Sequence, residues 1–292
     1  MITDFHTHLA YHKIYPDRFL ASLFGMEETD LKKSKHLKLL KLFLRDHSAK
    51  KLIKQMDDAN IQKAVLLIVD DNNYLGRSEV DIYDKFEIHR MVLEKYQDRF
   101  YVFAGYHPLR NDRLELLQKG IEEYGFCGIK LYPPFNFRVN DSIMTECYEY
   151  ANEKGLTILS HTGFSMKGLK NTYADPKDFL DIVDRYPNVN FVLAHAGYKL
   201  SDPIVNKLIR KHNVYADLAG HKTATREELA LIFEPSYNPK ILFGSDWPIN
   251  NMMKPLSYLI NSLESLYHEK KINNPELLEN ILYNNASKLL SK

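Results

Sequence analysis

The chain is poor in the residues that mark several special classes of protein. Only two of its 292 residues are cysteines, and Cys127 and Cys147 form no CxxC pair. A disulfide framework is therefore not expected, and a reduced, intracellular setting is the simplest interpretation. The 39 basic and 38 acidic side chains leave a formal net charge of +1. Such a balance indicates no surface for nucleic acid and none for a membrane.

Long apolar runs are also missing, so no membrane-spanning segment is expected. Met1 leads directly into the first predicted strand, which leaves no room for a signal peptide. These features predict a cytoplasmic protein. Hydrophobic residues make up 45% of the chain, which is enough for a large core. We expect a single domain over residues 1–292.

Short apolar or β-branched runs alternate along the chain with longer segments of helical periodicity. Eight runs are predicted as strands: Ile2–Phe5, Ala64–Val69, Tyr101–Gly105, Cys127–Leu131, Thr157–Ser160, Asn190–Ala194, Val214–Asp217 and Ile241–Gly244. Helices are predicted between them over Ser48–Ala59, Val80–Tyr96, Leu114–Tyr124, Ser142–Lys154, Pro176–Arg185 and Arg226–Phe233.

Strict alternation of strand and helix indicates a parallel sheet covered by helices. Eight such units favour a closed (β/α)8 TIM barrel over an open sheet. Two segments lie outside the alternation. The stretch Leu9–Asp46 is too long for an ordinary loop, so we expect an insertion after strand one, over about residues 9–47. The tail Pro275–Leu290 is predicted to be a closing helix.

The first strand carries a pair of histidines. His6 and His8 are two residues apart, so they point to the same side of the strand, together with Asp4. Two imidazoles on one side can hold a divalent cation, although an HxH pair alone is weak evidence. Three more predicted strands lead into a histidine or an aspartate, namely His161, His195 and Asp246. In a TIM barrel these strand ends meet at one face, so a metal site is predicted there.

The segments around these residues resemble the signatures of a known family. Asp4-x-His6-x-His8, Ser160-His161-Thr162-Gly163, Ala194-His195-Ala196-Gly197 and Gly244-Ser245-Asp246-Trp247-Pro248 are similar to the motifs of the amidohydrolase superfamily, in its amidohydrolase-2 (amidohydrolase-related) branch. The similarity runs from the first strand to the terminal Asn285–Leu290, with only the insertion undetermined.

The resemblance implies a metal-dependent hydrolase with one divalent cation held by His6, His8, His161 and Asp246. It also implies that His195 lies beside the metal as an acid, a base or a polarising residue. Imidazole and carboxylate ligands suit Zn²⁺, with Mn²⁺ and Fe²⁺ as alternatives. Asp246 is expected to accept a proton from the attacking water.

Lys130, in the predicted fourth strand, decides between one metal and two. In two-metal relatives a lysine at this place is carbamylated and bridges the cations. In one-metal branches with a similar GxKLxPP segment it stays an ammonium ion. We favour the second interpretation, in which Lys130 is a catalytic residue that attracts a substrate carboxylate or stabilises developing negative charge. A salt bridge inside the barrel remains the alternative.

Three further residues are predicted to contact the substrate: Tyr132 after strand four, His107 after strand three and Asp217 at the end of strand seven. Asp217 has a second interpretation, as a carboxylate that orients a metal-bound imidazole. The expected partner is a small molecule with an amide, lactone or ester bond, and the sequence leaves a homodimer open.

Three other functions compete with hydrolysis. A non-oxidative decarboxylase of a small, aromatic carboxylic acid would use the same one-metal site, and an aromatic mouth with a cationic Lys130 suits it. A TatD-type nuclease is disfavoured because those proteins place a glutamate where this chain has Lys130, and because the net charge is close to zero. A barrel without catalysis is disfavoured because no expected ligand position is missing.

Overall fold

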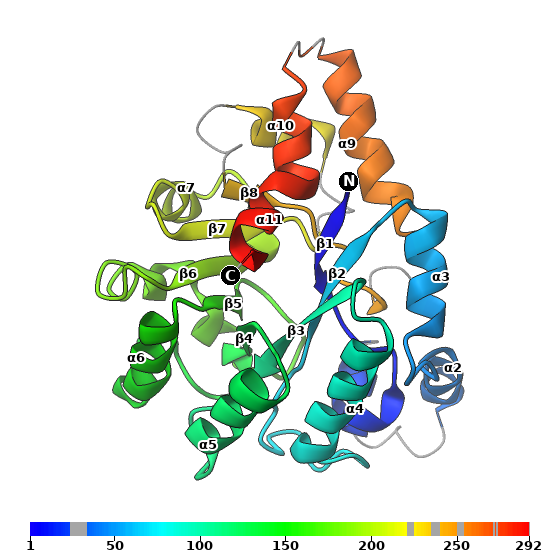
Figure 1. The fold of residues 1–292 in the computed structure, drawn as a ribbon, viewed down its shortest axis with the longest axis vertical. Helices are drawn as coiled ribbons and strands as arrows, with labels where there is room; N and C mark the ends of the chain where they lie inside the picture. Colours follow the sequence, from blue (N-terminus) through cyan, green and yellow to red (C-terminus); the bar gives the residue numbers. More distant parts are fainter. Residues whose placement is uncertain are drawn as a thin grey trace.

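The computed structural model describes residues 1–23, 34–220, 225–234, 240–249, 254–270, 272 and 274–291, except for the side chain of Tyr198. Eight parallel strands form one sheet in the order β1 to β8 (Figure 1). They are β1 (Thr3–Thr7), β2 (Lys63–Leu67), β3 (Phe100–Gly105), β4 (Gly128–Leu131), β5 (Thr157–His161), β6 (Asn190–Ala194), β7 (Val214–Asp217) and β8 (Ile241–Leu242).

The sheet closes into a barrel between its first and last strands. Phe5 donates its backbone N–H to the carbonyl of Phe243 at 2.9 Å, and Asp246 donates to the carbonyl of His6 at 2.8 Å. His8 donates in turn to the carbonyl of Trp247 at 2.7 Å. The predicted (β/α)8 barrel is therefore confirmed. Regular β8 ends at Leu242 rather than at Gly244, and its continuation still runs alongside β1.

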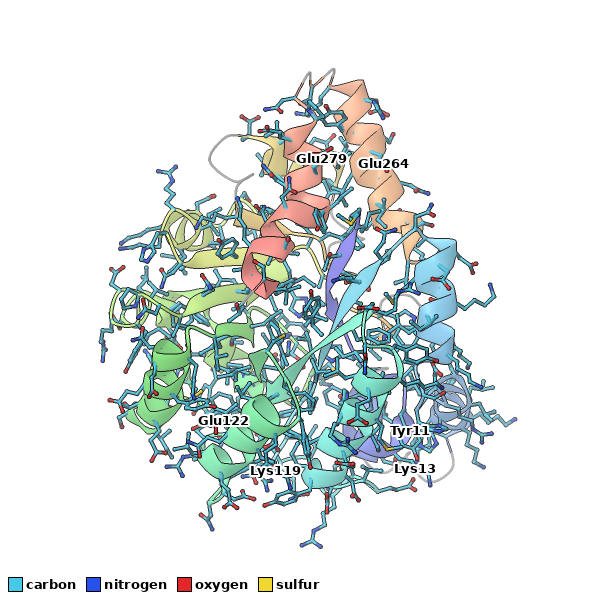
Figure 2. The ribbon with its side chains drawn as sticks, in the orientation of Figure 1. Tyr11, Lys13, Lys119, Glu122, Glu264 and Glu279 are labelled. Atoms are coloured by element: carbon cyan, nitrogen blue, oxygen red, sulfur yellow. The ribbon has the colours of Figure 1, made fainter. Side chains whose placement is uncertain are left out.

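Helices surround this barrel (Figure 1). The α-helices are α1 (Asp17–Ser22), α2 (Lys35–Phe43), α3 (Lys50–Asp58), α4 (Ile82–Lys95), α5 (Arg113–Gln118), α6 (Thr145–Lys154), α7 (Pro203–Ile209), α8 (Arg226–Ala230), α9 (Ser257–Glu269), α10 (Glu276–Glu279) and α11 (Asn285–Leu290). The outer helical surfaces are charged, as Glu122, Glu264 and Glu279 show in Figure 2.

One predicted helix is wrong in type. The segment Pro176–Arg185 is expected to be α-helical, but it forms a 3₁₀ helix, η7 (Pro176–Phe179), followed by turns. The hydrogen bonds from Leu180 to Lys177 and from Ile182 to Phe179 span three residues. This tighter winding places Phe179 and Ile182 on one face, and both are buried there.

The two ends of the barrel differ in character. Apolar side chains of the strands fill the interior together with residues of α11 in one cluster that includes Phe5, Leu67, Phe103, Ala286 and Leu289. The C-terminal helix thus closes the end where the strands begin, as predicted for the tail. The opposite end, where the strands finish, carries the histidines. No helix of the described chain is both long and apolar enough to cross a membrane.

Candidate metal centre

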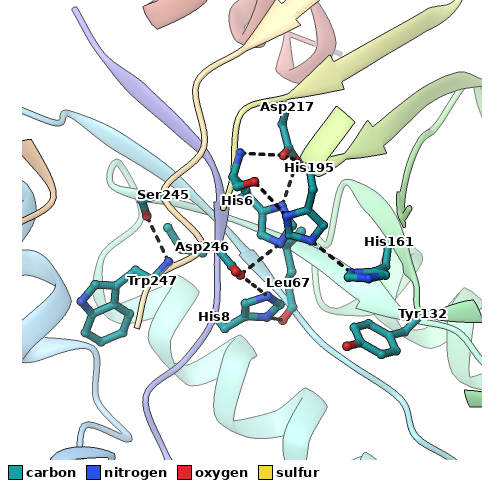
Figure 3. Close-up of polar contacts among 12 residues, drawn as sticks. His6, His8, Leu67, Tyr132, His161, His195, Asp217, Ser245, Asp246 and Trp247 are labelled. Atoms are coloured by element: carbon teal, nitrogen blue, oxygen red, sulfur yellow. Dashed lines mark hydrogen bonds and ion pairs between the residues drawn. The ribbon is translucent and has the colours of Figure 1, made fainter. Parts of the chain in front are cut away.

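Three donor atoms from the two ends of the chain converge at the mouth of the barrel. His6 lies in β1, His8 follows it, and Asp246 follows β8. The Nε2 atoms of His6 and His8 each lie 3.5 Å from Oδ1 of Asp246 (Figure 3). Asp246 has a φ of +57°, an unusual conformation for a residue with a side chain, and it turns the carboxylate toward the histidines.

The spacing of these atoms fits a metal ion. Ligands about 2.0–2.2 Å from a tetrahedral Zn²⁺ lie about 3.3–3.6 Å from one another. The two separations of 3.5 Å fall within that interval. His6, His8 and Asp246 also form one of two groups in the described chain whose donor atoms all lie within 4.8 Å. The residues present therefore fit a divalent cation.

The outer nitrogen of each histidine faces an oxygen acceptor. Nδ1 of His6 donates to Oδ2 of Asp217 at 2.8 Å, and Nδ1 of His8 donates to the carbonyl of Leu67 at 3.0 Å. Because a neutral imidazole carries one N–H, these bonds leave the Nε2 lone pairs directed at the site. Such hydrogen bonds commonly set the tautomer of a metal ligand.

The carboxylate of Asp217 is buried behind the histidines and accepts several hydrogen bonds. Oδ1 of its carboxylate accepts the backbone N–H groups of His195 at 2.8 Å and Ala219 at 3.0 Å. The second donor group of the described chain, His6, His195 and Asp217, consists of these hydrogen-bonded partners. Both oxygens of Asp217 are engaged, and it does not line the cavity described below, while its expected contact with a substrate stays a prediction.

His161 and His195 form a second pair on β5 and just after β6. Nδ1 of His161 lies 3.0 Å from Nε2 of His195, whose Nδ1 donates to the carbonyl of Ala219 at 2.9 Å. The ring of His195 lies 4.9 Å from that of His6, between centroids. The structure thus places His161 next to His195, outside the group formed by His6, His8 and Asp246.

The turns that carry these two histidines are tied together. Gly163 has a φ of +82°, and a Cβ there would lie 2.7 Å from the carbonyl oxygen of Gly197. Thr162 bridges the same gap, because its hydroxyl donates to the carbonyl of Ala194 at 2.6 Å and accepts the N–H of Gly197 at 3.1 Å. The glycines after both histidines therefore allow the two strand ends to approach.

Burial sets the protonation of the cluster. It lowers the pKa of His6, His161 and His195 below the usual value, and the nearby Lys130 adds to this effect at His6. Burial also opposes ionisation of Asp246, but its interactions with His8, His6 and His195 outweigh it, so the pKa of Asp246 lies well below its ordinary range. Neutral imidazoles and an ionised carboxylate are the forms that bind metal.

Lys130 lies at the floor of the site on β4 and is 1% exposed. Burial lowers the pKa of its ammonium group to about 8, while the charges of Asp217 and Asp246 oppose this shift. At neutral pH the ammonium form therefore predominates. Asp4, below the histidines, accepts the backbone N–H groups of His6 at 3.2 Å and Ser245 at 2.9 Å and so ties β1 to the turn that holds Asp246.

A cavity of about 250 Å³ opens over these groups. His6, His8, Lys130, His161, His195 and Asp246 form its polar side. Tyr132 lines it as well, with its ring 4.7 Å from that of His161. The remaining lining residues, which sequence reasoning missed, are Tyr15, Phe19, Leu20, Leu23, Val69, Ser165, Met166 and Ile249. They carry no motif that would have revealed them.

His107 lies elsewhere. It is buried, its Nε2 donates to the carbonyl of Phe135 at 3.0 Å, and it is not among the residues that line this cavity. Its ring packs against Phe137 at 5.1 Å between centroids. The structure therefore gives His107 a contact to the backbone after β4, and its expected contact with a substrate stays a prediction.

Comparison with solved structures shows the same fold at low sequence identity. A 4-oxalomesaconate hydratase from Rhodopseudomonas palustris is 18% identical, with a TM-score of 0.67 over 100% of this chain and 96% of that one. A dihydroxybenzoic acid decarboxylase from a Polaromonas species, with bound manganese and the inhibitor 2-nitroresorcinol, is 15% identical, with a TM-score of 0.66 over 99% and 97%.

A probable 2-pyrone-4,6-dicarboxylic acid hydrolase from Acinetobacter baumannii is 15% identical, with a TM-score of 0.61 over 100% of this chain and 99% of that one. At these identities the likeness concerns the fold alone. No curated protein sequence matches the chain. The family model described as amidohydrolase matches residues 3–292, and this protein thus belongs to the amidohydrolase family of metal-dependent enzymes, as its motifs suggested.

Proposed function

We propose that this protein is a metal-dependent hydrolase that acts on an amide, lactone or ester bond of a small molecule. The observation that carries the proposal is the convergence of three donor atoms, with His6 Nε2 and His8 Nε2 each 3.5 Å from Asp246 Oδ1, in the cavity at the mouth of the barrel. We assign the cation to these three residues, with His161 as the fourth ligand and Zn²⁺ as the preferred metal.

When bound, a divalent cation supplies a Lewis acid that polarises a carbonyl group and makes water a stronger acid. The chain supplies the remaining chemistry. The Asp246 carboxylate, which its low pKa keeps ionised, accepts the proton of the attacking water and returns it to the leaving group. Asp217 keeps Nε2 of His6 unprotonated through its bond to Nδ1.

Lys130 and His195 line the same cavity as the three donor residues. The buried ammonium of Lys130 faces the cavity, where it stabilises negative charge on the substrate. His195 holds its proton on Nδ1 through the carbonyl of Ala219, so its Nε2 lone pair is directed at Nδ1 of His161. We assign polarisation of the substrate to this pair, and substrate contact to Tyr132 on the cavity wall.

Decarboxylation of a small aromatic carboxylic acid is the second candidate. Two observations favour it: the Lys130 ammonium is the one lysine or arginine among the described lining residues, and the aromatic rings of Tyr15, Phe19 and Tyr132 line the same cavity. A carboxylate would then point to Lys130 and the metal side. The ring would contact the aromatic residues.

The test compares the purified protein with two variants. Metal content is measured first, and hydrolysis is then followed in heavy-oxygen water over a panel of esters, lactones and amides. Asp246→Asn should abolish turnover. Asp178→Asn is the matched control, because Asp178 is a buried carboxylate paired with Arg138 away from the cavity, and it should keep the activity.

Full activity in Asp246→Asn would refute the assigned role of this carboxylate. Release of CO₂ from an aromatic acid, without incorporation of heavy oxygen into the product, would show that decarboxylation and not hydrolysis is the function.

A further inference from the structure

Trp247 is the single tryptophan of the chain and directly follows Asp246. It is 1% exposed, and its indole points away from the histidines of the site (Figure 3). Two hydrogen bonds hold its backbone: its carbonyl accepts the N–H of His8 at 2.7 Å, and its own N–H donates to Oγ of Ser245 at 3.1 Å. Because Asp246 lies between Ser245 and Trp247, a contact that fixes Trp247 also fixes the carboxyl-terminal side of Asp246.

The indole N–H of Trp247 donates to Oε1 of Gln55 at 2.9 Å. Gln55 stands 192 positions earlier in the chain, on α3, and is partly buried. A buried indole N–H that loses its acceptor becomes an unsatisfied polar group, which is costly. Without Gln55 the indole is therefore expected to shift, and the backbone of Trp247 is expected to move with it.

The helix α3 gives this acceptor a fixed position. Oδ2 of the buried Asp46 accepts the backbone N–H groups of Lys51 at 2.8 Å and Leu52 at 3.2 Å, at the start of the helix. Leu52 and Met56 are fully buried in the hydrophobic core. Because Gln55 lies between these two core residues in the helix, its amide is anchored by packing that does not depend on the site.

The backbone of Asp246 needs such support. Its φ of +57° is unfavourable for a residue with a Cβ atom, and such conformations persist only where the surrounding structure enforces them. On the amino-terminal side, Asp4 accepts the N–H of Ser245 at 2.9 Å. Asp246 itself donates its N–H to the carbonyl of His6 at 2.8 Å. On the carboxyl-terminal side the support comes from Trp247, and its loss would turn the carboxylate away from the two histidine nitrogens 3.5 Å from it.

Resting on the proposed function, in which Asp246 holds the cation, we infer that Gln55 is a positioning residue. Through the indole of Trp247 it keeps the carboxylate of Asp246 in place for the metal. Neither Gln55 nor Trp247 lines the cavity, so their effect on the cation passes through Asp246. The support of the metal centre thus extends from the barrel strands to the outer helix α3.

Zinc affinity tests this inference without turnover. Metal-free protein is titrated with Zn²⁺ against a competing chelator. Gln55→Met keeps the length of the side chain but offers no oxygen to the indole. It should bind zinc about tenfold more weakly, at the lower end of the effect of groups bonded directly to a ligand. Gln55→Glu retains an acceptor and should bind zinc like the original protein.

The matched control is Gln118→Met. Gln118 is also a partly buried glutamine of an outer helix, α5, and it does not line the cavity. Its replacement should leave the zinc affinity unchanged. Because Trp247 is the one tryptophan, the fluorescence excited at the indole band reports on it alone. The emission maximum should move in Gln55→Met and stay in place in Gln118→Met.

A double variant separates positioning from a general loss of stability. Trp247→Phe has no N–H to donate, so on its own it should weaken zinc binding by a factor similar to that of Gln55→Met. Adding Gln55→Met to Trp247→Phe should cost no further zinc affinity, because the two residues act through one hydrogen bond.

An unchanged zinc affinity or an unchanged emission maximum in a folded Gln55→Met protein would overturn the inference. Equal losses in Gln55→Met and Gln55→Glu would do the same, as would losses that add in the double variant, since the hydrogen bond to the indole would then not be the cause. If Gln55→Met does not fold, Trp247→Phe decides alone, and an unchanged zinc affinity in that variant refutes the inference.

Asp246→Asn, in the same titration, separates this inference from the proposed function. If Asp246→Asn binds zinc as tightly as the original protein, the proposed metal site is wrong and the inference fails with it. If Asp246→Asn loses zinc while Gln55→Met retains it, the inference alone is refuted. The expected affinities in a protein that hydrolyses none of the esters, lactones and amides would refute the hydrolase alone.

Discussion

Replacing Asp217 by Asn should weaken metal binding without unfolding the protein. The two side chains have the same shape, and Oδ1 of the amide can still accept the backbone N–H groups of His195 and Ala219, now at 2.8 and 3.0 Å. The other oxygen, 2.8 Å from Nδ1 of His6, becomes an NH₂ group. Two donors would then face each other, which favours the His6 tautomer with its proton on Nε2.

The size of the effect follows from this change of tautomer. A proton on Nε2 of His6 occupies the lone pair of one of the three converging donor atoms. The cation must displace this proton before it can bind there. Loss of such supporting hydrogen bonds typically lowers metal affinity by about 10- to 100-fold, or about 1.4–2.8 kcal/mol. We expect a loss in this interval, with the free energy of unfolding of the metal-free protein changed by much less.

The assay is a titration of metal-free protein with Zn²⁺ in the presence of a competing chelator, followed by denaturation in urea. Asp178→Asn serves as the control, because it also converts a buried carboxylate to an amide, at a place where the partner is Arg138. An unchanged zinc affinity in a folded Asp217→Asn protein would show that Asp217 does not set the tautomer of His6.

Two other predictions concern stability. Burial raises the pKa of Asp70 from 3.8 to about 6, so this carboxyl group keeps its proton to a higher pH in the folded protein than in the unfolded chain. The protonated group therefore stabilises the folded protein fully below pH 3.8, and this contribution is lost as the pH rises through 6. Urea denaturation should show the original protein losing about 1 kcal/mol relative to Asp70→Asn between pH 5 and pH 7, and equal slopes would contradict the assigned pKa. Gly163→Ala should cost at least about 2 kcal/mol, because it adds a clash with Gly197 to the cost of a positive φ. Gly125→Ala is its control, since Gly125 has a φ of +73° with no atom within 4 Å of the added Cβ, and a similar loss in both variants would exclude the clash as a cause.

The barrel could be predicted because its strands are short, apolar and regularly spaced. A strand buried on both faces appears in the sequence as an unbroken apolar run, such as Phe191–Ala194. Eight such runs, separated by segments long enough for a helix, are compatible with few folds. The residues at which the strands end could be predicted less accurately. The segment after Leu242 pairs with β1 through scattered hydrogen bonds and so stops being a regular strand before Gly244.

The convergence of His6, His8 and Asp246 could be predicted because histidine and aspartate are residues that bind cations, and because barrel strands bring their ends together. The apolar residues that line the cavity could not, since Leu20 or Met166 in a sequence is indistinguishable from a core residue. Their position depends on how α1 packs against Tyr132 and the loop after β5. His107 illustrates a different limit: it follows a strand, but the direction of its side chain is set by a hydrogen bond to Phe135.

The closure of the barrel bears on how quickly the protein opens. The seam joins Asp4 to Ser245, 241 positions along the chain, and His6 to Asp246, so its contacts close long loops and carry a large loop-closure entropy. Contacts of such long range are expected to form late in folding, and interactions that form late act mainly on the rate of unfolding. A cation held by His6, His8 and Asp246 would link the two edges of the sheet. It would therefore lower the rate of unfolding, and so lengthen the lifetime of the folded state, more than it raises the rate of refolding.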